Sequence, residues 1–247
     1  MISVIVPVLN EAENIRALVK EILGEAGSIP IREIVYVDDG STDDTLARLI
    51  DQMREVPILR VVHHDRALGQ SAAFLSGARA ATQELLVFMD GDLQNDPADI
   101  AVLLERYRLA VRASNTRIAV LGQRAVRNDS TLRKISSRLA NGLRASVLND
   151  GTRDTGCSLK LIRREDFLAL PYFDHVHRFL PAMLLRIGVQ LVHVQVSHRA
   201  RTHGRSKYGF WNRAMVGGVD LLGVAWLVRR RLPGDYQPRE IMKAEPQ

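Results

Sequence analysis

The sequence has 247 residues, of which 46% are apolar and 25% charged, so the chain can bury a sizeable core and is neither disordered nor fibrous. The formal net charge of +6 indicates an anionic partner: nucleic acid, anionic lipid or a phosphorylated small molecule. The single cysteine, Cys157, excludes an intrachain disulfide and indicates a reducing compartment.

The first half of the chain alternates between short apolar runs and amphipathic stretches. Near-continuous apolar strands separated by helices are typical of a parallel sheet covered on both faces. The predicted strands are 2–7, 33–39, 58–64 and 84–90, and the predicted helices are 11–26, 43–54, 70–81 and 97–111. We therefore expect an α/β fold with a Rossmann-like, mostly parallel sheet flanked by helices.

The second half is less regular. Its pattern predicts strands at 118–121, 158–162 and 189–197, and helices at 130–148 and 177–187. A basic loop at 199–209 then leads into a final apolar segment.

Polar residues follow each of the first four predicted strands. In open α/β sheets, ligands bind beyond the carboxyl ends of the strands, so this edge is the expected binding site. His63 and His64 lie there, but adjacent strand residues point to opposite faces, so packing or surface roles are expected for them. The four segments are Pro7-Val8-Leu9-Asn10-Glu11, Asp38-Asp39-Gly40-Ser41-Thr42, His63-His64-Asp65-Arg66 and Asp90-Gly91-Asp92.

Two carboxylates, Asp90 and Asp92, end the fourth strand. Such a pair repels itself unless a cation or a donor lies between the two groups. Oxygen ligands of this kind suit Mg²⁺ or Mn²⁺, which also bind substrate phosphates. The structural alternative is a turn at Gly91 with Asp92 capping the next helix.

The acidic run from Asp38 to Thr45 also has two interpretations. Ser41, Thr42 or Asp43 could cap the following helix, whereas a carboxylate at the strand end could bind a ribose or a base. The sequence contains neither G-x-G-x-x-G nor G-x-x-x-x-G-K-[ST], which argues against a nicotinamide dinucleotide and a P-loop ATPase.

Four early blocks together resemble glycosyltransferase family 2 enzymes with the GT-A fold: SVIVPVLNEAENI, VDDGSTDDT, GQSAAFLSGARAA and FMDGDLQNDP. The later blocks LGQR, DTGCSLKLIRRE and RTHGRSKYGF are similar to those of polyprenyl-phosphate glycosyltransferases of the dolichyl-phosphate mannose synthase type. The resemblance covers about residues 1–212. Asp-Gly-Asp replaces the commoner Asp-Ala-Asp, and Cys157 stands where many relatives carry a bulky aromatic residue.

The resemblance implies roles at the matching positions. The first loop and the acids after the second strand would bind the nucleotide-sugar donor, the Asp-Gly-Asp carboxylates would hold Mg²⁺ or Mn²⁺, and basic residues would meet the donor and acceptor phosphates. The implied nucleotide-sugar ligands are Pro7, Asn10, Glu11, Asp38, Asp39, Asp90, Arg201 and Ser206; the metal ligands are Asp90, Asp92 and Gln94; and the catalytic residues are Asp92, Arg124, Arg138, Arg205 and Lys207.

The resemblance also implies an organisation. A catalytic domain would span 1–212, with a nucleotide-binding half at about 1–111 and an acceptor-binding half at about 112–212; an amphipathic membrane-interface helix at 213–232 and a polar tail at 233–247 would follow. Residues 214–228 are too short for a bilayer core of about 30 Å, so the segment is expected in the membrane interface or packed on protein.

The sequence thus predicts a metal-dependent, inverting transferase that moves a sugar from a UDP- or GDP-linked donor to polyprenyl phosphate. It would lie peripherally on the inner face of the cytoplasmic membrane, since the N-terminus shows no secretory signal. One alternative is a soluble family 2 enzyme acting on a glycan or another hydroxyl acceptor. Another is a nucleic-acid-binding module, which the acidic edge argues against because carboxylates repel phosphate. The sugar and the oligomeric state stay open.

Overall fold

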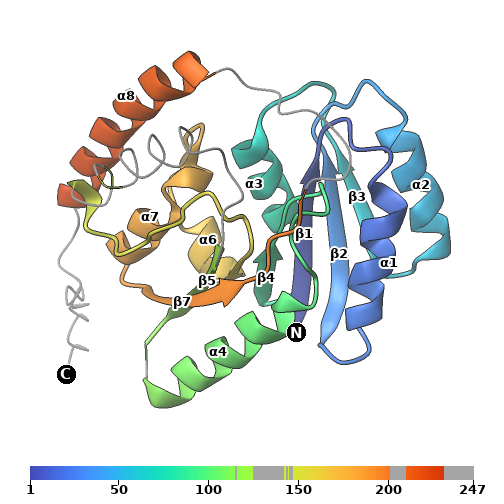
Figure 1. Ribbon diagram of the computed structural model, residues 1–247, viewed down its shortest axis with the longest axis horizontal. Coiled ribbons are helices and arrows are strands. Elements are labelled where there is room, and N and C mark those ends of the chain that lie inside the picture. Colours follow the sequence, from blue (N-terminus) through green and yellow to red (C-terminus); the bar gives the residue numbers. More distant parts are fainter. Residues whose placement is uncertain (115, 125–141, 143, 145–146, 201–209, 231–247) are drawn as a thin grey trace, which may run out of the picture.

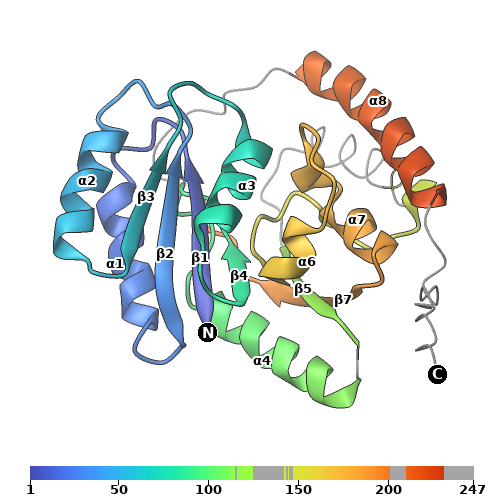
Figure 2. The same cartoon turned by 180° about the vertical axis from the view of Figure 1, so that it is seen from behind.

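The computed structural model describes residues 1–114, 116–124, 142, 144, 147–200 and 210–230, with the side chains of 210–217 excepted. Within these residues, seven strands form one sheet in the order β3-β2-β1-β4-β6-β5-β7, with helices on both faces (Figures 1 and 2). The strands are β1 (Ile2–Val8), β2 (Ile31–Asp38), β3 (Leu59–His63), β4 (Leu85–Phe88), β5 (Ile118–Arg124), β6 (Lys160–Arg163) and β7 (Gln190–Val196). The helices are α1 (Ile15–Glu25), α2 (Thr45–Glu55), α3 (Gln70–Ala80), α4 (Asp99–Ala113), α6 (Arg164–Leu168), the 3-10 helix η1 (Val176–Arg178), α7 (Leu180–Arg186) and α8 (Phe210–Arg229).

The sheet is mostly parallel, which confirms the predicted fold class. β1 pairs in parallel with β2 and β4, β2 with β3, and β5 with β7. β6 runs antiparallel to both β4 and β5, a direction that its apolar pattern did not reveal. The residues that precede β6 therefore arrive at the edge where the parallel strands end.

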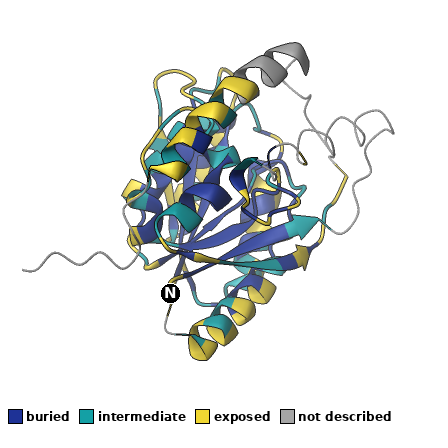
Figure 3. Cartoon of the chain, turned by 90° about the vertical axis from the view of Figure 1, so that its left-hand side faces the viewer, coloured by how far each residue is buried: buried dark blue, intermediate teal, exposed yellow. Residues whose placement is uncertain are grey.

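Each face of the sheet has its own apolar core. On one face, α1, α2 and α4 pack against the strands through residues such as Leu18, Leu49 and Leu103. On the other, α3, α6 and α7 contribute Phe74, Phe167 and others. Figure 3 shows the strands as the buried layer between these helices. The buried positions of α1 recur at helical spacing, which explains why the sequence predicts this helix.

The last helix packs against α7. In a third apolar cluster, Val224 and Ala225 of α8 pack with Met183 of α7 and with Phe179, the residue before α7. In addition, Arg186 Nε donates to the Leu227 carbonyl at 3.0 Å. α8 begins three residues before the predicted 213–232 segment. No helix among the described residues is long and apolar enough to cross a membrane. Of the predicted helix 130–148, only 142, 144, 147 and 148 are described, and all four are helical.

Helix α3 approaches β1 and β2 closely at Gly77. A Cβ at this position would lie 2.4 Å from Ile5 Cγ2 and 3.1 Å from Val37 Cγ2. Both neighbours are fully buried β-branched side chains that have little room to move.

Gly77→Ala should therefore destabilise the protein. Overpacking costs about 1–3 kcal/mol, and the gain of about 1 kcal/mol in helix propensity offsets only part of it. Gly24→Ala in α1 is the control, because nothing lies within 4 Å of a Cβ there. Urea unfolding should show a loss for Gly77→Ala and none for Gly24→Ala; equal stability of the two variants would contradict the close packing.

Candidate active site

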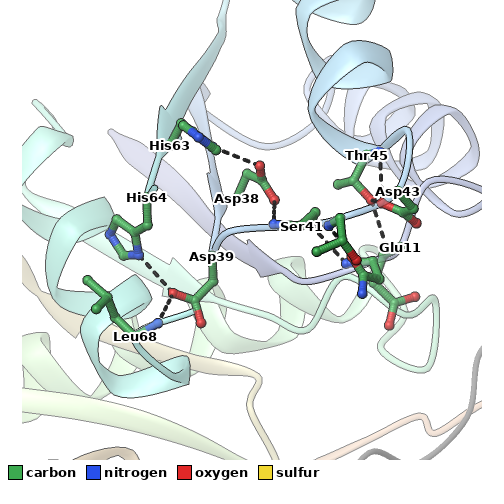
Figure 4. A network of polar contacts seen from close by, with 11 residues as sticks. Glu11, Asp38, Asp39, Ser41, Asp43, Thr45, His63, His64 and Leu68 are labelled. Atoms are coloured by element: carbon green, nitrogen blue, oxygen red, sulfur yellow. Dashed lines mark hydrogen bonds and ion pairs between the residues drawn. The ribbon is translucent and has the colours of Figure 1, made fainter. Parts of the chain in front are cut away.

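The predicted ligand edge is built first from the loops after β1 and β2. Asn10, which has a positive φ of 54°, accepts a hydrogen bond from Thr42 N at 2.7 Å and donates its own N–H to Ser41 Oγ at 2.9 Å. The Glu11 N–H donates to Thr45 Oγ1 at 2.9 Å. These bonds hold the two loops side by side (Figure 4).

The N-cap of α2 is Asp44, whose side chain makes no capping hydrogen bond, and not one of the three predicted residues. Asp43 Oδ1 accepts the Thr45 N–H at 2.9 Å, at the beginning of α2. Asp38 and Asp39 have other partners, so helix capping does not explain them.

The two strand-end acids are buried and hydrogen-bonded. Asp38 is fully buried, accepts the Ser41 N–H at 3.2 Å and lies 2.9 Å from His63 Nδ1. Asp39 accepts the N–H groups of Leu68 and Gly69, both at 2.8 Å, and lies 2.8 Å from the Nδ1 of the next histidine, His64. Figure 4 shows each acid facing its own histidine.

The sequence expectation of packing or surface roles missed these histidine pairings. The parallel pairing of β2 and β3, which the sequence predicts, would have indicated them, because its register places Asp38 beside His63. Because adjacent residues alternate faces, His64 then reaches the other acid.

The Asp-Gly-Asp turn is held on several sides. Asp90 Oδ1 accepts from Gln70 Nε2 at 2.8 Å, and the Asp90 N–H donates to Asn95 Oδ1 at 3.0 Å. Asp92 is only 6% exposed and accepts the Gln94 N–H at 3.2 Å. A Cβ at Gly91 would lie 2.4 Å from Val8 Cγ1 of β1. The position therefore has no room for a side chain.

The surroundings of Asp90 shift the pKa of its carboxyl group. Burial, and secondly the charge of Asp92, raise the pKa of Asp90 to about 6. No group of three His, Cys, Asp or Glu side chains that could hold a metal exists among the described residues. A close carboxylate pair nevertheless fits a divalent cation that takes further ligands from a substrate diphosphate.

Arg124, at the end of β5, makes a bidentate ion pair. Its Nε and Nη2 donate to the Asp154 carboxylate at 2.6 and 2.7 Å. Its predicted contact with the acceptor phosphate stays a prediction. The predicted residues Arg138, Arg201, Arg205, Ser206 and Lys207 lie outside the described residues.

The chain that leads into the basic loop is fastened beside the Asp-Gly-Asp turn. The Arg199 N–H donates to the Gln94 carbonyl at 2.9 Å, and Gln94 Nε2 donates to the Arg199 carbonyl at 3.4 Å. Arg199 also pairs with Glu21 and Asp96, both at 2.7 Å. The described start of the basic loop, Arg199, therefore lies next to the predicted metal ligand Gln94.

Sequence reasoning missed a second group of polar residues near Asp90. His177 of η1 places Nδ1 2.7 Å from Ser71 Oγ in α3. Burial, followed by the charges of Arg178, Lys160 and His175, lowers the pKa of His177 to about 3. Burial also lowers the pKa of Lys160 in β6. Ser71 and Lys160 lie within the blocks GQSAAFLSGARAA and DTGCSLKLIRRE, but the resemblance implied no role for either, and no block contains His177.

Carboxylates beyond the ends of parallel strands, in a sheet with this order, are typical of enzymes that bind nucleotide-linked substrates. The sequence model described as Glycosyl transferase family 2 matches residues 3–170, and the chain belongs to that family.

Two relatives carry specific names. The chain is 37% identical over 244 residues to a dodecaprenyl-phosphate galacturonate synthase of Rhizobium johnstonii, an alignment covering 95% of this chain and 70% of the relative. It is 32% identical over 212 residues to an undecaprenyl-phosphate 4-deoxy-4-formamido-L-arabinose transferase of Edwardsiella ictaluri, covering 84% of this chain and 63% of the relative.

Solved structures share the fold. Glucosyl-3-phosphoglycerate synthase from Mycobacterium tuberculosis, in complex with UDP, superposes with a TM-score of 0.64 at 20% identity, covering 92% of this chain and 79% of that one. Its complex with Mn²⁺, UDP and glucosyl-3-phosphoglycerate gives the same values. The GT-A fold expected from the resemblance is thereby confirmed.

The buried histidine makes stability depend on pH. His177 is neutral in the folded protein down to about pH 3, whereas the unfolded chain takes up the proton below about 6.5. The unfolded state thus binds more protons within this window, and the free energy of unfolding falls as the pH drops through it, by up to about 1.4 kcal/mol per pH unit. Urea unfolding between pH 4 and 7 should give a shallower pH slope for His177→Gln than for the wild type; parallel slopes would contradict the buried, neutral histidine.

Proposed function

We propose that the protein transfers a sugar from a nucleotide-sugar to a polyprenyl phosphate. The observation that carries this proposal is that two acid pairs, Asp38–Asp39 and Asp90–Asp92, lie at one sheet edge in a family 2 chain. Asp38, Asp39 and Asp92 are buried, and Asp90 is partly buried. The names of both relatives contain a polyprenyl phosphate, which supports the acceptor.

The donor would lie along this edge. Asp38 and Asp39, with Pro7, Asn10 and Glu11 of the neighbouring loop, would hold the nucleoside. Asp90 and Asp92, with Gln94 beside them, would hold Mg²⁺ or Mn²⁺, which supplies positive charge to the diphosphate leaving group. The Mn²⁺ and UDP in the M. tuberculosis enzyme support this class of ligand.

The acceptor needs positioning rather than a strong base. A phosphate monoester has a second pKa of about 6, so it is already an anionic nucleophile near pH 7. Arg124 and Arg138, with Arg201, Arg205, Ser206 and Lys207 of the basic loop, would orient its oxygens. Direct displacement at the anomeric carbon would invert its configuration.

The second candidate is a family 2 enzyme that glycosylates a hydroxyl group of a glycan. A hydroxyl acceptor needs a general base near the reacting carbon. The raised pKa of Asp90, about 6, is the observation that favours it, since a base works best with a pKa near the working pH; His177, with a pKa of about 3, is a weak base. The test of the first candidate separates the two, because only a phosphate acceptor becomes labelled in the lipid phase.

Helix α8 would attach the protein to the membrane. Its inner face packs on α7, and its outer face exposes Val219, Leu222 and Trp226, which are 72%, 73% and 57% exposed and recur at helical spacing. Arg230 lies 5.1 Å above the Trp226 ring, beside the exposed Arg229. An apolar stripe with aromatic and cationic residues fits an anionic membrane surface. The buried free thiol of Cys157 suits the reducing, cytoplasmic side.

The Asp-Gly-Asp carboxylate gives the direct test of activity. The full chain would be mixed with Mn²⁺, a short-chain polyprenyl phosphate and radiolabelled UDP- or GDP-sugars, and the label extracted into organic solvent would be counted. Asp92→Asn should reduce transfer at least about 100-fold, because the developing leaving-group charge loses its stabilisation, and EDTA should abolish wild-type transfer. Asp51→Asn on the exposed face of α2 is the matched control and should keep full activity.

Absence of lipid-phase label with every donor, despite nucleotide binding, would favour the hydroxyl acceptor. Full activity of Asp92→Asn would contradict the metal site.

The outer face of α8 predicts membrane binding. The double variant Leu222→Glu/Trp226→Glu should co-sediment with phosphatidylglycerol vesicles at least about 10-fold more weakly than the wild type, since each change replaces apolar contact by repulsion. Leu109→Glu is the control, because this leucine of α4 is 48% exposed on another surface. If both variants bind like the wild type, α8 is not the attachment surface.

A further inference from the structure

A buried lysine lies beside the Asp-Gly-Asp turn through the antiparallel pairing of β6. Lys160 is opposite Phe88 in the register of β4 and β6. Side chains on one face of a strand recur every second residue, so Lys160 shares its face with Asp90, two residues beyond Phe88. Diagonal neighbours of this kind are within reach of a long side chain. The apolar residues of this face, Phe88 and Ile162, belong to the core under α3.

The ammonium group of this lysine is enclosed without a carboxylate partner in the described structure. Lys160 is 5% exposed, and its Nζ donates to the carbonyl of Cys157. The described residues provide no ion pair for it. The two carboxylates whose charges act on Lys160 bond to other residues, Asp154 to Arg124 and Asp90 to Gln70. An ammonium has three donors, and burying one unpaired is costly, so the fold leaves donors for a ligand.

The strand order shows which part of the donor would meet Lys160. The sheet runs β2-β1-β4-β6 across the edge. With the nucleoside over β2 and β1 and the diphosphate at β4, the next strand, β6, lies under the diphosphate–sugar end. His177 pairs with Ser71 of α3, and the charge of Lys160 is one of those that lower the pKa of His177.

We infer that Lys160 is a donor-binding residue whose Nζ contacts an anionic oxygen at the sugar end of the nucleotide-sugar. This inference rests on the proposed function. Two sources share the chemistry: the phosphate next to the sugar, and the carboxylate of a uronic acid.

Isothermal titration of the full chain with Mn²⁺ would separate the sources. The probes are UMP, UDP, UDP-glucose and UDP-glucuronate, with GMP, GDP and GDP-mannose as the guanine set. The variants are Lys160→Met, which removes the charge, and Lys160→Arg, which keeps it; Lys20→Met, an exposed lysine of α1, is the control. Should Lys160→Met not fold, Lys160→Gln replaces it.

A phosphate contact predicts that Lys160→Met binds the nucleoside diphosphate about 10- to 100-fold more weakly, with the monophosphate unchanged. A carboxylate contact predicts the same loss for UDP-glucuronate alone, with UDP and UDP-glucose unchanged. In both cases Lys160→Arg should stay within about threefold of the wild type. A merely structural role would weaken all the probes together, because it does not distinguish one from another.

The inference would be overturned, and the proposed function left standing, by either of two results. In one, Lys160→Met binds every probe within about twofold of the wild type; in the other, it loses affinity for all of them equally. A wild-type chain that binds neither uridine nor guanosine nucleotides would overturn the proposed function together with it.

Discussion

Like charges at one edge of the sheet are the constraint on which the site depends. Asp38, Asp39 and Asp92 are almost fully buried, and Asp90, two residues before Asp92, is partly buried. Buried carboxylates are costly unless hydrogen bonds or cations satisfy them. The structure satisfies the first pair with two histidines and three backbone N–H groups, whereas burial and the charge of Asp92 raise the pKa of Asp90 in the second pair. The first pair is thus held by bonds within the protein, whereas the second is the pair for which we propose a cation.

Much of this edge could be predicted from the sequence, because it depends on local patterns of apolar and polar residues. The alternation of apolar runs and amphipathic helices predicts the strands from β1 to β4 within a few residues, and parallel order then gathers Asn10, Asp38 and Asp90. Gly40, at the turn after Asp39, has a φ of 73°, and a Cβ there would lie 2.4 Å from the Arg66 backbone. A tight turn at that position was therefore readable from the residue type.

The rest could not be predicted, because it depends on tertiary pairing. The four residues of β6, Lys-Leu-Ile-Arg, do not show in which direction the strand runs. That direction nevertheless decides that Lys160 lies on the same face as Asp90. His177 reaches Ser71 across 106 positions of sequence. The pairing of Arg124 with Asp154 likewise needs the fold to bring two loops together, so a phosphate-binding arginine and an ion-paired arginine look alike in the sequence.

Helix α8 belongs to the fold as well as to the surface. Its Val224 and Ala225 cover Phe179 and Met183, and Asp220 lies 3.3 Å from the ring of His175, just before η1. A chain shortened before this helix, in the hope of better solubility, would uncover an apolar patch over α7 instead. The shortened chain would also lose the Asp220 partner of the segment that carries His177. The proposed membrane attachment and the packing of α7 and η1 thus share one helix, and deleting it would remove both.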